Sequence, residues 1–64
     1  MSAVRQARQL CLDSIAAWRR EAWNLRALSL RNSISEESAM RLRREAEAAD
    51  AQAAWWLNAA IELI

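Results

Sequence analysis

The chain contains neither glycine nor proline in its 64 residues. These two residues form most tight turns and interrupt most regular structure, so a chain without them has few places to change direction. Its commonest residues, Ala, Arg and Leu, are strong helix formers. β-branched residues are few and scattered. The sequence therefore predicts an all-α fold built from long helices.

Only one short polar segment is able to interrupt the helical pattern. Asn32 tolerates the left-handed conformation that ends many helices, and Ser side chains compete for backbone hydrogen bonds. Ser35 followed by Glu36 and Glu37 is typical of a helix start, because the hydroxyl caps free amides and the carboxylates face the positive end of the helix dipole. Ser33 with Glu36 forms a competing capping box. We favour Ser35 as the cap.

This single interruption divides the chain into two helices within one domain, residues 1–64. The first helix is expected over about residues 3–31, the turn over about 32–35, and the second helix over about 36–63. With one turn between two long helices, the second helix folds back on the first. We therefore expect an antiparallel hairpin.

The second helix carries a regular seam of small residues. Alanine recurs every seven residues, and a second series follows three positions later: Ala39, Ala46, Ala53 and Ala60, then Leu42, Ala49, Trp56 and Leu63. This is a heptad pattern with alanine at every a position, which lets a partner helix approach closely. The first helix carries larger apolar residues at 3-4 spacing: Val4, Ala7, Cys11, Ile15, Trp18, Ala22, Leu25 and Ser29.

Large residues on one helix and small residues on the other interdigitate when the helices pair. In an antiparallel hairpin, Trp18 is expected opposite Ala46 to Ala53, and Leu25 opposite Ala39 to Leu42. Cys11 on this stripe is read as a small buried hydrophobic residue. The positions that we expect in the seam of the hairpin or of a dimer are Cys11, Ile15, Trp18, Leu25, Ala46, Ala53, Trp56 and Leu57.

A single seam does not cover all the apolar residues. Leu10, Leu12, Trp23, Leu30 and Trp55 all lie away from it. They add several hundred Å² of apolar surface, an area that usually marks an interaction site. A chain of this size is also near the limit for a stable core of its own. We therefore expect a homodimer that forms a four-helix bundle, with parallel and antiparallel docking of the two hairpins both open.

Arginine and tryptophan together suggest a surface for a larger protein partner. Arg8, Arg19 and Arg26 recur on one side of the first helix, and Trp23 and Trp55 lie off the seams. Trp and Arg are enriched in interface hot spots. We expect these five residues to bind a larger protein, which the chain would modulate or inhibit. So minimal a chain would suit a phage- or mobile-element-encoded inhibitor of a host or defence complex.

Other classes of function fit less well. The chain has no histidine, no phosphate-binding loop and no metal-ligand pattern, so we expect no enzyme activity, cofactor or metal. The net charge of +1 disfavours nucleic acid, although a nucleic-acid-associated regulator using the arginine stripe is the alternative. The last ten residues are apolar but lack the Lys or Arg that binds anionic lipid, which disfavours a membrane surface. One cysteine and no signal-peptide core indicate a cytoplasmic protein.

Overall fold

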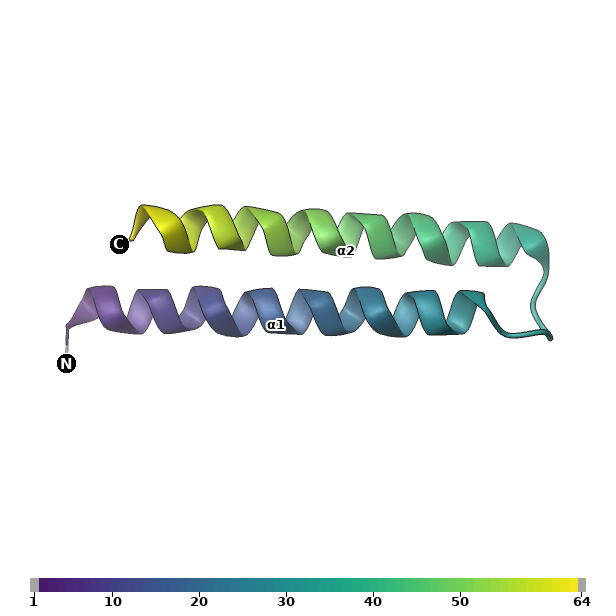
Figure 1. Cartoon of the computed structure of the whole chain (residues 1–64), viewed down its shortest axis with the longest axis horizontal. Helices are drawn as coiled ribbons and strands as arrows, with labels where there is room; N and C mark the ends of the chain where they lie inside the picture. Colours follow the sequence, from purple (N-terminus) through teal and green to yellow (C-terminus); the bar gives the residue numbers. More distant parts are fainter. Residues whose placement is uncertain (1, 64) are drawn as a thin grey trace.

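The computed structural model describes residues 2–63, and these form two helices that lie side by side and run in opposite directions (Figure 1). Helix α1 spans Ala3–Ser29 and helix α2 spans Glu36–Glu62. The Cα atoms extend over 49 × 16 × 10 Å, so the molecule is a single layer of two helices. The prediction of an all-α hairpin is confirmed, and residues 2–63 contain no strand.

Both helices begin at a serine cap. The Ser35 hydroxyl accepts a hydrogen bond from the backbone amide of Ser38 at 3.1 Å, and Glu36 and Glu37 occupy the first turn of α2. Ser2 caps α1 in the same way, with the amide of Arg5 donating at 3.2 Å. Each hydroxyl pairs an amide that has no partner within the helix. Ser35 is therefore the cap of α2, as expected.

Helix α1 ends two residues earlier than expected, at Ser29 rather than residue 31. The amides of Leu30 and Arg31 donate to carbonyls three residues back, those of Ala27 and Leu28, each at 3.2 Å. Such bonds tighten the last turn and end the helix in right-handed geometry. No residue in the range 2–63 has a positive φ. The left-handed ending expected at Asn32 is thus wrong, and the turn begins at Leu30.

The seam between the helices is lined by alanine. Ala22 of α1 packs with Ala46 and Ala49 of α2, and their exposed fractions are 1%, 0% and 2%. The other buried positions are Cys11, Ile15, Ser29, Ala39, Ala53 and Ala60. Because the methyl groups are small, the two backbones can approach closely, as the heptad pattern predicted.

Leu25 is half-buried and packs against the cluster of Ala22, Ala46 and Ala49. Its expected place opposite Ala39 to Leu42 stays a prediction.

Candidate protein-binding surfaces

A single layer of two helices leaves a long face uncovered on each side of the seam. One of these, here called the Trp23 face, is identified by a shallow depression whose lining comes from both helices: Arg26, Ser29, Leu30, Arg43 and Glu47. Arg26 also pairs with Asp50 across the seam on this face. Residues spaced by seven share one side of a helix, so Trp23 lies with Leu30, and Arg19 with Arg26. Trp23 is 76% exposed and Leu30 77% exposed.

Three of the expected partner-binding residues therefore lie together on the Trp23 face: Arg19, Trp23 and Arg26. Arg8 lies on the same side of α1 as Arg19, eleven residues or about 16 Å before it, and is exposed. The structure thus gathers Arg8, Arg19, Trp23 and Arg26 on one side of one helix. It does not bring Trp55 to them.

The ion pair between Arg26 and Asp50 joins the two helices on the Trp23 face. The hydrogen bond that the Arg26 guanidinium donates to the Asp50 carboxylate is the main cause that raises the pKa of Arg26. The negative charges of Asp50 and Glu47 raise this pKa further. The guanidinium therefore stays charged at every physiological pH. Both side chains are nearly half exposed, so solvent screens the pair and it adds little to stability.

The opposite face, here called the Trp18 face, is also built from both helices. A second shallow depression there is lined by Trp18, Glu21, Leu25, Glu45, Ala48, Ala49 and Gln52. Trp55 lies nine residues after the buried Ala46, which is half a turn around the helix at about 100° per residue, so it projects away from α1. The expected partner-binding set is therefore divided between the helices: Trp55 projects from the outer side of α2, whereas Arg8, Arg19, Trp23 and Arg26 lie on α1.

The tryptophan pair of α2 is arranged edge to face. The ring centroids of Trp55 and Trp56 are 5.0 Å apart, and their planes meet at 88°. Trp55 is 62% exposed, whereas Trp56 is half-buried beside the seam. Trp55, which the sequence placed off the seam, is therefore the exposed member of the pair. Aromatic pairs prefer this geometry, so the exposed ring rests on the half-buried one.

The expected seam residues fall into three groups in the hairpin. Cys11, Ile15, Ala46 and Ala53 are buried. Leu25 and Trp56 are half-buried. Trp18 and Leu57 remain 37% and 41% exposed, so the hairpin alone does not bury them. Their expected place in the seam of a dimer stays a prediction.

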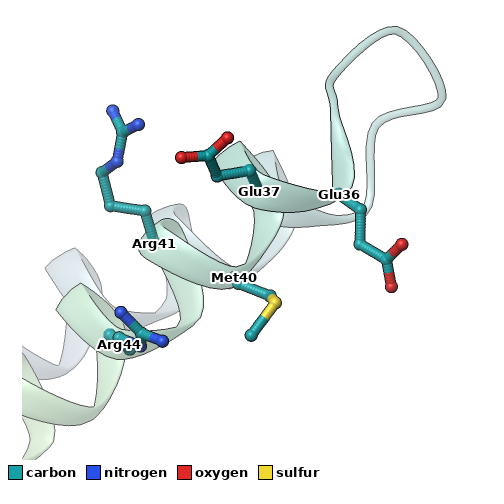
Figure 2. A pocket seen from close by; sticks show the side chains of 5 residues that line it. All are labelled: Glu36, Glu37, Met40, Arg41 and Arg44. Atoms are coloured by element: carbon teal, nitrogen blue, oxygen red, sulfur yellow. The ribbon is translucent and has the colours of Figure 1, made fainter.

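A third depression, beside the turn, comes from α2 alone (Figure 2). Glu36, Glu37, Met40, Arg41 and Arg44 line it, and their side chains project outward on different sides of the helix. Met40 is 44% exposed. The depression is the space between solvated side chains of one helix, and no second element closes it. It is therefore a weaker candidate for a binding surface than either face of the hairpin.

Sequence reasoning missed the ion pair between Arg26 and Asp50. Charge pairs that spacing alone can indicate join residues three or four apart on one helix. Within residues 2–63 the structure forms the interhelical pair instead. The two partners are 24 residues apart, so recognising them requires the register of the hairpin. Among the same residues, no three His, Cys, Asp or Glu side chains lie close enough together to hold a metal ion.

No known protein family matches the chain, and no curated protein or solved structure is significantly similar to it. Within the described residues, neither helix combines the length and apolarity needed to cross a membrane.

Proposed function

We propose that this chain is a small non-enzymatic interaction protein that forms a homodimer and binds a larger protein, whose activity it modulates or inhibits. The observation that carries the proposal is the amount of apolar surface left on the hairpin. Eleven large hydrophobic side chains in the described residues are exposed, among them Trp23, Leu30, Leu10 and Trp55, each at least 60% exposed. Surface of this kind marks sites of protein contact.

The Trp23 face is the surface that suits a different protein. Trp23 is the most exposed tryptophan and lies between Arg19 and Arg26 on α1. An exposed indole beside guanidinium groups is the composition of interface hot spots, because each offers a large contact area and a directed donor. The arginines also cover apolar neighbours with their stems when no partner is bound. We assign partner binding to Arg8, Arg19, Trp23 and Arg26.

Affinity capture from the native host's lysate, followed by mass spectrometry, tests partner binding. Trp23→Ala should release the captured protein while circular dichroism shows unchanged helicity. Trp55→Ala is the matched control: it removes an exposed tryptophan from α2 instead of α1 and should retain the partner. Equal capture by the parent and Trp23→Ala would contradict the assignment of this face.

Light scattering tests self-association and should give about twice the chain mass of 7.3 kDa. A mass equal to one chain at all concentrations would refute the proposed dimer.

The arginine stripe, Arg8, Arg19 and Arg26, also allows a test for nucleic-acid binding. Asp50 already pairs with Arg26, which weakens the positive field of the stripe. A salt-dependent shift of labelled DNA or RNA that disappears in an Arg8→Ala and Arg19→Ala double variant would favour a nucleic-acid regulator instead.

A further inference from the structure

The core of the hairpin is open on the Trp18 face. The alanines of the seam are buried, but the larger side chains that follow them are not: Trp18 is 37% exposed, and Leu25, Leu42 and Trp56 are half-buried. No large side chain in residues 2–63 is fully buried. These residues form one side of a core whose other side is missing from the single chain. A second layer of helices would complete it.

The two flanks of the seam differ sharply in charge. On the Trp23 face the flanking positions are Arg5, Leu12, Arg19, Arg26, Arg43, Asp50 and Leu57, of which five are charged. On the Trp18 face they are Ala7, Ser14, Glu21, Leu28, Ser38, Glu45, Gln52 and Ala59, of which two are charged. Covering charged groups costs desolvation energy that covering small neutral groups does not. The Trp18 face is therefore the one that another copy can cover most readily.

The surface area also matches a second copy. The hairpin exposes 5085 Å², whereas a compact monomer of its mass exposes about 4,200 Å². The excess of roughly 900 Å² is close to the area that each partner buries in a stable protein–protein interface, about 800 Å². The excess belongs to the hairpin as a whole, and a second hairpin packed along one of its faces would bury area on this scale.

We propose that a second copy of this chain covers the Trp18 face, with the two hairpins docked antiparallel, so that the Trp23 faces point outward on both sides of a four-helix bundle. This inference rests on the dimer of the proposed function and names its interface.

The docking direction follows from two carboxylates. Glu21 lies five residues from the midpoint of α1, and Glu45 lies four residues from the midpoint of α2, both toward the turn. Antiparallel docking about a central two-fold axis separates the two copies of Glu21 by about 15 Å along the helices. Parallel docking would bring all four carboxylates to one level in a poorly solvated interface, where like charges repel strongly. Trp18, close to the midpoint, then contacts the second copy near the axis.

A matched pair of variants tests the interface. Ala48 and Ala54 are both exposed alanines of α2, but Ala48 lines the Trp18 face and Ala54 follows Glu47 by seven residues on the Trp23 face. Burying an unpaired carboxylate is costly, so Ala48→Glu should raise the dissociation constant of the dimer at least about tenfold in analytical ultracentrifugation. Ala54→Glu should leave the constant unchanged. If Ala54→Glu weakened the dimer and Ala48→Glu did not, the Trp18 face would not be the interface, although the chain would still be a dimer.

Spin labels at the turn test the docking direction. Asn32→Cys in a Cys11→Ala background places one label at the turn of each hairpin, and circular dichroism confirms that the variant folds. If Cys11→Ala fails to fold, Asn32→Cys is labelled in the parent, where Cys11 is buried. Antiparallel docking should separate the labels by about the 49 Å length of the hairpin. Parallel docking would give less than about 20 Å, since packed helices lie 8–10 Å apart, and would overturn the antiparallel arrangement.

The outcomes separate this inference from the proposed function. If the chain is monomeric, both the proposed dimer and the proposed interface are refuted. If the chain is a dimer and Ala48→Glu does not weaken it, only the interface on the Trp18 face is refuted. Binding of a larger protein through Trp23 is measured separately by capture and does not depend on either result.

Discussion

Replacing Ala46 by leucine probes the closest contact of the hairpin. Ala46 is completely buried and packs with Ala22 and Ala49, so the three added carbons have no space unless the helices move apart. Overpacking of this kind costs about 1–3 kcal/mol. A domain of this length has a free energy of unfolding of roughly 3–10 kcal/mol, so the loss is a large share of it.

The assay is thermal unfolding followed by circular dichroism at matched protein concentration. A loss of 1–3 kcal/mol should lower the melting temperature by about 4 to 24 °C in a domain of this size. Ala51→Leu is the control, because Ala51 lies on the same helix but is exposed. Leucine and alanine have similar helix propensities, so the control should melt within a few degrees of the parent. If Ala46→Leu also melts with the parent, the helices are not closely packed at Ala46 and the reasoning fails.

Three further predictions concern single contacts. Ser35→Ala removes the cap of α2 and should cost about 0.5–2 kcal/mol in chemical unfolding, whereas Ser33→Ala, next to it in the turn, should not. Cys11 is 5% exposed, so its thiol should resist a thiol reagent in the native protein and react rapidly in denaturant; rapid native reaction would contradict its burial. Arg26→Ala and Asp50→Ala should show a small coupling in a double-mutant cycle that disappears at high salt, and a large salt-independent coupling would contradict a screened surface pair.

The two helices and the alanine seam were predictable because their causes are local. Without glycine or proline there was one place for a turn, and Ser35 before two glutamates identified the start of α2. The period of seven in α2 required alanine to face α1, and Ala39, Ala46, Ala53 and Ala60 are all buried. These features depend on hydrogen bonds and spacing within one helix.

The relations between the helices were harder to predict, because they depend on the exact length of the turn. The packing of Leu25 against Ala46 and Ala49 of α2 depends on how the two helices are aligned. The same alignment brings Arg26 to Asp50, a contact that spacing within a helix does not reveal. Trp23 and Trp55, by contrast, were correctly expected to lie off the seam, because helical spacing alone indicates this, and both are exposed.

The alanine repeat has a consequence for how the hairpin holds its alignment. A surface that repeats every seven residues presents nearly the same shape to α1 after a slip of one heptad, about 10 Å along the axis. The repeat therefore fixes which side of α2 faces inward but specifies its longitudinal position poorly. The short connection of residues 30–35 limits that sliding. A longer connection would allow the two helices to exchange alignments. The turn therefore sets the longitudinal position of α2 relative to α1, and the alanines set which side of α2 packs inward.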